Sequence, residues 1–138
     1  MRFMMLMIPR GYERAAPAAM PSAEQIAEMM AYNESLARAG VLLSLDGLHP
    51  PSGAKRVVFS RRGEKPEVIE GPFVGASETV GGYWILRVRS EAEALEWACR
   101  CPAWEGDTIE LRRIQELEDF PAEDLPPMSP DLVRPSAR

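Results

Sequence analysis

The chain has 138 residues, which is enough for one domain with a modest hydrophobic core. Hydrophobic residues make up 46% of it and charged residues 27%, the composition of an ordinary globular protein. The net charge of −5 excludes the basic surface that direct nucleic-acid binding requires, and it makes an anionic membrane surface an equally poor partner.

The first predicted element is a strand over residues 3–8, whose sequence FMMLMI is apolar at every position. A run this short, followed by Pro9, favours a strand that is covered on both faces. The same run is too short to cross a membrane, and no signal-peptide cleavage pattern follows it. We therefore expect a soluble, cytoplasmic protein.

A helix is predicted between Ser22 and Gly40. Ser22 and Gln25 form an S-x-x-Q capping box, and Gly40 suits the position just after a helix. Residues 9–21 before it contain three prolines and one glycine and predict a loop. Apolar residues at helical spacing predict the buried stripe of this helix, which consists of Ile26, Met29, Met30, Leu36 and Ala37.

A second strand is predicted over residues 41–45 (VLLSL). Residues 55–60 and 66–69 then predict a β-hairpin, because two short runs with β-branched residues flank a turn that contains a glycine.

A glycine-rich loop over residues 70–82 separates this hairpin from the next predicted strand, residues 83–89. Gly81 and Gly82 are expected to allow a close backbone approach or a positive φ. Side chains of the strand alternate between two faces, with Trp84, Leu86 and Val88 on one and Tyr83, Ile85, Arg87 and Arg89 on the other.

A second helix and a last strand complete the pattern. Ser90 and Glu93 predict another capping box, Pro102 ends the helix, and residues 108–114 predict the strand. The apolar stripe of the helix is expected to consist of Leu95, Ala98 and Cys99. Cys99 and Cys101 point to different faces of a helix, so we expect two partly buried free thiols and neither a disulfide nor a metal site.

The order β-α-β, hairpin, β-α-β predicts an α+β, ferredoxin-like fold, in which an antiparallel sheet carries both helices on one face. The other face is then bare, and a face that displays Phe3 or Met4 with their alternates cannot remain in water. Dimerisation through that face is the simplest remedy, so we expect a homodimer. The domain spans residues 1–114, and the acidic, proline-rich residues 115–138 predict a mobile or loosely docked tail.

A series of short motifs runs through the predicted domain. In chain order they are Gly47-Leu48-His49-Pro50-Pro51, Glu70-Gly71-Pro72-Phe73, Ser77-Glu78, Gly81-Gly82-Tyr83-Trp84, Glu93-Ala94-Leu95-Glu96-Trp97-Ala98 and Ile109-Glu110-Leu111-Arg112. Each is weak alone, but in this order and spacing they resemble the DGPF-motif branch of the YCII-related family. The resemblance covers nearly all of residues 1–114 and implies a dimeric α+β barrel.

The departures from the family pattern limit what the resemblance implies. Glu70 stands where the motif has aspartate, and Ser77 stands where the family has lysine. In the wider family a histidine on the first helix and a nearby aspartate have been proposed as a catalytic pair, and the position that aligns with this histidine is Asn33. An amide cannot act as a base, so this chemistry does not carry over and the catalytic residues stay unknown.

Seven residues are candidates for a binding cleft: Asn33, His49, Glu70, Phe73, Glu78, Tyr83 and Arg87. Asn33 either bonds to the backbone of the Gly71 loop or lines the cleft, because a polar group in an apolar stripe needs a partner. Tyr83 and Arg87 either orient a ligand or belong to the dimer interface.

The remaining candidates also have two interpretations each. His49 is the only histidine and the side chain that titrates nearest neutral pH, although a loop role is commoner. Glu70 caps the glycine-rich loop by accepting backbone N–H bonds, or it shares a proton or a cation with Glu78. With no nucleophile motif and no metal cluster, we expect no cofactor and no metal.

These observations favour a protein that binds a small molecule in a cleft between the sheet and the glycine-rich loop 70–82. The alternative is a non-catalytic accessory module, because proteins that resemble this family often accompany extracytoplasmic-function sigma factors. A structural homodimer with a vestigial pocket is the third interpretation.

Overall fold

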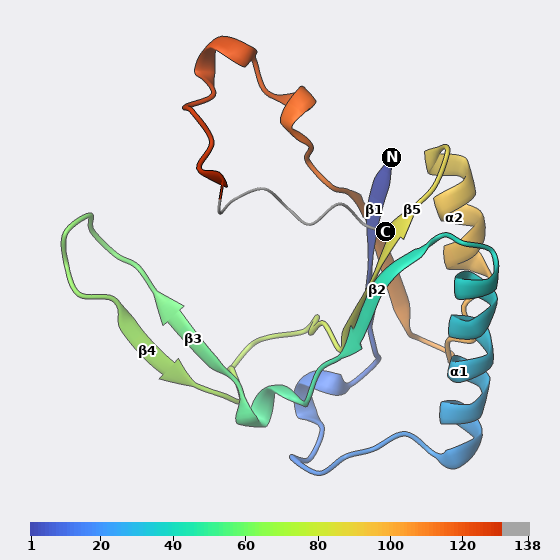
Figure 1. Cartoon of the computed structure of the whole chain (residues 1–138). Helices are drawn as coiled ribbons and strands as arrows, with labels where there is room; N and C mark the ends of the chain where they lie inside the picture. Colours follow the sequence, from blue (N-terminus) through green and yellow to red (C-terminus); the bar gives the residue numbers. More distant parts are fainter. Residues whose placement is uncertain (131–138) are drawn as a thin grey trace.

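Four antiparallel strands form one sheet, and two helices cover a single face of it (Figure 1). The computed structural model describes residues 1–130, so the end of the predicted tail, residues 131–138, lies outside the described residues. The elements are, in chain order, β1 (Arg2–Ile8), α1 (Ala23–Arg38), β2 (Leu42–Gly47), β3 (Lys55–Val58), β4 (Glu67–Glu70), β5 (Gly82–Arg87), α2 (Glu91–Cys99) and β6 (Thr108–Arg113).

The sheet has the strand order β2-β5-β1-β6, and every neighbouring pair is antiparallel. The two β-α-β units, β1-α1-β2 and β5-α2-β6, interleave their strands in this order, as in a ferredoxin-like fold. The predicted α+β class, the antiparallel sheet, the helices on one face and the hairpin insertion are thus confirmed. Formation of a dimeric barrel stays a prediction.

The two faces of β1 are unequally covered. Phe3, Met5 and Met7 are buried against the helices. The alternate residues Met4 and Leu6 are only half-buried, on the face that carries no helix. The helices thus cover one face of the predicted strand, and cover of its other face depends on the predicted dimer and stays a prediction. We call this uncovered side the open face, and its central residues are Met4, Leu6 and Ile8 of β1 and Tyr83, Ile85 and Arg87 of β5.

Helix α1 begins and ends as predicted. The Ser22 hydroxyl accepts the Gln25 N–H at 3.2 Å, and the Gln25 side chain accepts the Ser22 N–H at 2.8 Å. Gly40 follows the helix at a φ of 74°, a conformation that favours glycine.

The buried side of α1 agrees with the predicted stripe at Leu36 and Met29 and differs from it elsewhere. Tyr32 and Leu36 are buried, whereas Ile26, Met30 and Ala37 are exposed. Tyr32 packs edge-on against Trp84 at a centroid distance of 6.0 Å and donates its hydroxyl hydrogen to the carbonyl of Trp97 at 2.7 Å. Tyr32 thus connects α1 to β5 and α2, and burial raises its pKa, so the hydroxyl remains a donor.

Helix α2 also turns a different side to the sheet than expected. Ala94 is its buried residue, while Leu95 and Cys99 are exposed. The Ser90 hydroxyl accepts the Glu93 N–H at 3.2 Å, but the Glu93 carboxylate accepts the N–H of Arg89, not that of Ser90. The second capping box is therefore only half formed. Both cysteines are free, as predicted, and Cys101 is half-buried, but Cys99 is exposed and not partly buried as expected.

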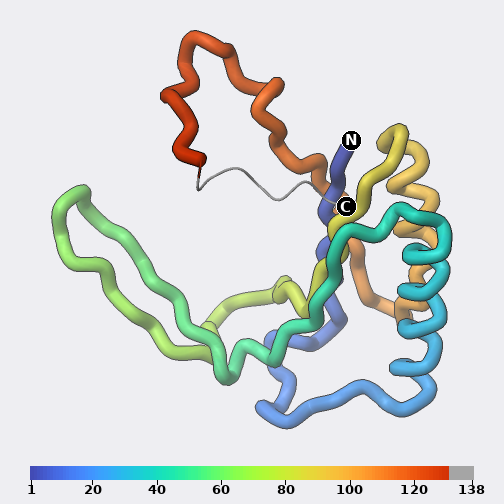
Figure 2. The backbone as a smooth tube through the Cα atoms, in the orientation of Figure 1, coloured from blue at the N-terminus to red at the C-terminus, as the bar shows by residue number. Residues whose placement is uncertain are grey.

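Two arms leave the sheet on the side of the open face (Figure 1). One is the β3–β4 hairpin, which forms a separate two-stranded sheet with every strand residue exposed. The other is the tail, residues 115–130, which contains short 3-10 turns at Leu117–Asp119 and Ala122–Asp124. The trace in Figure 2 shows that both arms extend away from the layer of helices.

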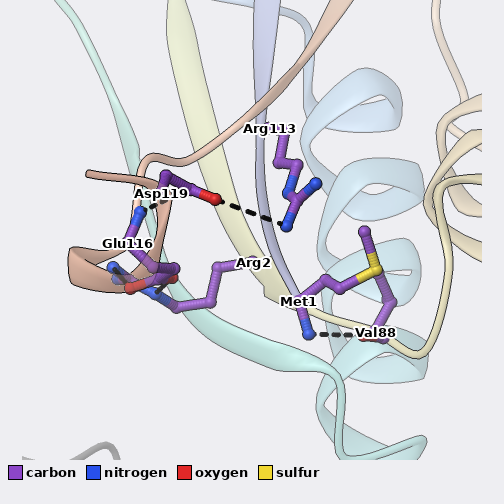
Figure 3. A network of polar contacts seen from close by, with 6 residues as sticks. All are labelled: Met1, Arg2, Val88, Arg113, Glu116 and Asp119. Carbon is purple, nitrogen blue, oxygen red and sulfur yellow. Dashed lines mark hydrogen bonds and ion pairs between the residues drawn. The ribbon is translucent and has the colours of Figure 1, made fainter. Parts of the chain in front are cut away.

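The start of the tail is tied to the first strand (Figure 3). Arg2 donates two hydrogen bonds to the Glu116 carboxylate, at 2.6 Å and 3.1 Å, and Arg113 lies 3.8 Å from Asp119. The N-terminal ammonium group donates to the carbonyl of Val88 at 3.0 Å. The hydrogen bond to Glu116 raises the pKa of Arg2. The tail is therefore docked where it begins, before it projects from the sheet.

Candidate functional site

An open cleft of about 840 Å³ lies where four segments that are distant in the sequence meet. These are the loop before α1, the first half of α1, residues 47–50 from the last residue of β2 onward, and residues 102–107 before β6. We call it the basal cleft. Most of its lining is apolar, and the largest apolar side chains in it are Met20, Ile26, Met29, Met30, Leu48 and Trp104.

Gly81, near the end of the glycine-rich loop 70–82, allows one wall of the cleft to form. A Cβ atom on Gly81 would lie 2.7 Å from Cγ of Pro9 and 3.3 Å from the Tyr12 ring. Gly81 also donates its N–H to Met7 at 2.8 Å and accepts the N–H of Leu48 at 2.9 Å. The predicted close approach is therefore confirmed at Gly81, and it allows the loop before α1 to pack against the start of β5.

Asp107 fixes the opposite wall of the cleft. Its carboxylate accepts the N–H of Arg10 at 2.9 Å and the N–H of Trp104 at 3.0 Å. One side chain thus holds the turn before β6 against the loop after β1. Trp104, which is 52% exposed, is kept at the cleft by this turn.

Tyr12 and His49 provide aromatic polar groups in the lining. The Tyr12 hydroxyl donates to the carbonyl of Leu48, which joins the loop before α1 to the segment after β2. Burial raises the pKa of Tyr12, so the hydroxyl remains a donor at neutral pH. His49 is exposed, and its imidazole can donate or accept a hydrogen bond from a bound molecule.

A second cavity, of about 540 Å³, is lined in part by Glu13 and Arg14 of the Tyr12–Arg14 turn. Residues 72–77 of the glycine-rich loop line it, including Phe73, and the Arg56 guanidinium stacks 3.9 Å from the centroid of the Phe73 ring. Within residues 1–130, Glu13 Oε2 and Ser52 Oγ are buried in its lining with no hydrogen-bond partner. A donor group from a bound molecule or a water would satisfy both atoms.

Asn33 takes a structural role that differs from the predicted one. Its Oδ1 accepts the indole N–H of Trp84 at 2.8 Å, on the helix side of the sheet. The expected bond to the backbone of the Gly71 loop is therefore wrong. Because Trp84 is 5% exposed, its N–H needs a protein partner, and Asn33 provides it.

Glu70 also differs from its predicted role as a loop cap. It belongs to β4 and pairs with Lys55, its cross-strand neighbour in β3, at 3.1 Å. Both side chains are exposed, so the pair contributes little to stability.

The structure does not bring the seven candidates together. His49 lines the basal cleft and Phe73 the second cavity. Tyr83 and Arg87 lie on the open face, where the Tyr83 hydroxyl donates to Asp46 at 2.8 Å and this bond raises its pKa. Glu78 is an exposed loop residue.

Sequence reasoning missed Tyr12, Trp104 and Asp107. A local signal existed for the last two, because Trp-Glu-Gly-Asp at residues 104–107 has the composition of a tight turn closed by an acid. That this turn meets residues 9–12 depends on the whole fold. Among residues 1–130 no cluster of three or more metal-binding side chains occurs, and no helix in this range could cross a membrane.

Comparison with protein families identifies a match over most of the chain. A family model described as YCII-related domain matches residues 1–118, which is most of the chain and extends to the first turn of the tail. No curated protein matches the chain.

Proposed function

The chain belongs to the YCII-related domain family, and we propose that it binds a small molecule in the basal cleft. The observation that carries the proposal is the cleft itself, with its volume of about 840 Å³ and its apolar lining. Small-molecule sites are concave, mostly apolar and typically about 300–1,000 Å³ in volume. The ligand that fits has an apolar or aromatic body.

Exposed apolar side chains support this choice over the second cavity. Met20, Met30 and Trp104 are 75%, 58% and 52% exposed, and all three line the basal cleft. An exposed cluster of large apolar side chains is typical of a binding surface. The proposal moves the ligand away from the glycine-rich loop, because residues 72–77 of that loop line the other cavity.

Polar groups in the lining favour a ligand that carries a hydrogen-bond acceptor. Arg10 and His49 both line the cleft, and a guanidinium group donates hydrogen bonds to a carboxylate or carbonyl oxygen. Asp107 is already engaged by two backbone N–H groups and does not compete for the ligand. A small carboxylic acid or ketone with an apolar body satisfies both parts of the cleft.

We also propose that the protein works in the cytoplasm as a homodimer that pairs through the open face. Half-buried Met4, Leu6 and Ile85 at the centre of that face support this assembly, because a partner sheet would cover them. The assignment to the DGPF-motif branch is likewise a proposal. Its support is the motif around Gly71, where a Cβ atom would collide with the carbonyl of Pro51.

The test compares two substitutions that each place a carboxylate at an exposed apolar position. Met30→Glu lies in the basal cleft, and Leu95→Glu lies on α2 outside it. The full-length variants are screened by thermal shift against a panel of aromatic and aliphatic carboxylic acids, ketones and amides. A ligand at about 100 times its Kd stabilises the native state by about 2.7 kcal/mol, which such a screen detects.

We expect at least one compound to stabilise the wild type and the Leu95→Glu variant, and to lose at least about tenfold in affinity for Met30→Glu. If Met30→Glu and Leu95→Glu bind equally well, the ligand lies elsewhere. If no compound stabilises any of the proteins, the binding proposal fails. The alternative of an accessory module beside an extracytoplasmic-function sigma factor then takes its place.

A further inference from the structure

The β3–β4 hairpin carries an apolar strip that its own domain does not cover. Val57 and Val68 are cross-strand partners, are 52% and 59% exposed, and point to the same side of the hairpin. Phe59, two residues after Val57, is 76% exposed. A hairpin of two strands is marginally stable in water unless its apolar side packs against something. This strip therefore requires a partner surface.

The tip of the same hairpin is basic. Residues 59–66 contain Arg61, Arg62 and Lys65 against the single acid Glu64, and all four side chains are exposed. Glu64 accepts a hydrogen bond from Ser60 at 3.2 Å and belongs to the turn. A suitable partner surface combines apolar side chains with acidic ones.

The tail has this combination. Residues 115–130 contain five acids and no basic residue. Leu117, Phe120 and Met128 are 47%, 43% and 47% exposed among them. The Arg2–Glu116 ion pair holds the start of this segment on the sheet, so the remainder leaves from a fixed point (Figure 3).

We propose that the acidic tail of one copy packs on the β3–β4 hairpin of a second copy, so that two reciprocal clasps hold the dimer together. The inference rests on the homodimer proposed above. The hairpin follows β2 at one edge of the sheet, and the tail follows β6 at the other. A two-fold axis that runs along the strands between two stacked sheets places the β6 edge of each copy over the β2 edge of its partner.

The hairpin is long enough for this contact. Eight residues from Lys55 to the tip at Arg62 span at most about 26 Å in an extended strand, whereas stacked sheets lie about 10 Å apart. Both arms project on the side of the open face, which is the side that the partner occupies (Figure 1). The hairpin leaves the sheet at the Gly47 end of β2 and the tail at the Arg113 end of β6, which are opposite ends of the strands. Figure 1 shows the hairpin rising toward the end where the tail leaves, so each hairpin passes the edge of the partner sheet in the direction of the partner's tail.

A mixing experiment with two charge-reversed chains tests the clasp. The first chain carries Arg61→Glu with Arg62→Glu, and the second carries Glu123→Lys with Asp124→Lys; all four positions are exposed. The matched control also reverses two charges in each chain, Arg38→Glu with Arg100→Glu in the first and Glu24→Lys with Glu28→Lys in the second, all at exposed positions on or next to the two helices and away from both arms. Native mass spectrometry measures the dimer species, and sedimentation measures Kd at low and high salt.

Each reversed chain alone faces like charges at both clasps, so we expect its homodimer Kd to rise at least about tenfold at low salt. When the two chains are mixed, opposite charges meet again at both clasps of the heterodimer. We therefore expect the heterodimer to form a larger fraction of all dimers than random pairing of the two chains gives. The control pair mixes statistically. If the reversed chains mix in the statistical proportion, the clasp proposal is overturned but the dimer proposal is not. A tail that packs on the hairpin of its own chain would give this same result. A wild-type chain that stays monomeric overturns the dimer itself.

Discussion

Replacing Asn33 by alanine tests whether this residue holds the core together or belongs to a ligand site. In the structure its Oδ1 is the acceptor for the indole N–H of Trp84, at 2.8 Å, and Trp84 is 5% exposed. Asn33→Ala removes the acceptor and leaves a buried donor unsatisfied, which costs about 1–3 kcal/mol. We therefore expect the free energy of unfolding to fall by about 2 kcal/mol.

The assay is urea unfolding followed by tryptophan fluorescence at one fixed protein concentration, because stability of a dimer depends on concentration. A double-mutant cycle with Trp84→Phe isolates the bond, because phenylalanine has no N–H to satisfy. Asn33→Ala should be less costly in the Trp84→Phe background by about 1 kcal/mol or more. Additive costs in the cycle, or a ligand affinity that falls in Asn33→Ala, would refute the structural role.

Two further predictions concern backbone packing and thiol chemistry. Gly81→Ala should lower the free energy of unfolding by about 1–3 kcal/mol, because the new methyl group would lie 2.7 Å from Pro9. Gly47→Ala should lower it far less, because no atom lies within 4 Å of the position of its new methyl group. Equal losses for the two variants, measured by urea unfolding, would contradict the packing of the cleft wall. The exposed Cys99 should react with a disulfide reagent at pH 8 in the native protein, while burial raises the pKa of Cys101 to about 11 and protects it. Because the folded pKa of Cys101 lies above its ordinary value of 9.0, its contribution to stability is complete below pH 9 and falls as the pH rises toward 11. Replacement of Cys101 by alanine should remove the loss of stability between pH 9 and 10, whereas the raised pKa values of Tyr12, Tyr32 and Tyr83 keep the loss above pH 10.

The sequence predicted those parts of the fold that depend on local signals. The capping box at Ser22, the glycine after α1 and the alternation around Trp84 are each encoded within a few residues, and each is present in the structure. Their order also identified the β-α-β pairs, because a ferredoxin-like sheet follows from that order. The stacking of a second copy on the open face was inferred from the apolar run at residues 3–8 and stays a prediction.

The helix stripes were only partly right, at Leu36, Met29 and Ala98, because apolar residues on α1 serve two surfaces. Ile26 and Met30 have helical spacing with the core residues but line the basal cleft, where they are 40% and 58% exposed. Periodicity identifies an apolar side of a helix and does not distinguish the core from a binding surface. The buried contact of α1 depends instead on Tyr32, whose aromatic ring and hydroxyl reach β5 and α2.

The basal cleft could not be predicted because its parts are far apart in the chain. Asp107 binds the backbone of Arg10 across most of the sequence, and Asn33 meets Trp84 from another element. Glu70 was misplaced for a smaller reason. The β4 strand extends to Glu70, so its side chain points toward Lys55 and not toward the glycine-rich loop.

The central claim, that a ligand lies in the basal cleft, is tested most directly by fluorine NMR of a chain labelled with 5-fluorotryptophan. The three tryptophans report on different places: Trp104 lines the cleft, Trp84 is buried against α1, and Trp97 lies on α2. Titration with a compound that stabilises the protein should shift the Trp104 resonance in proportion to saturation and leave the other two in place. A Trp104 resonance that stays unchanged while the site saturates would contradict the claim.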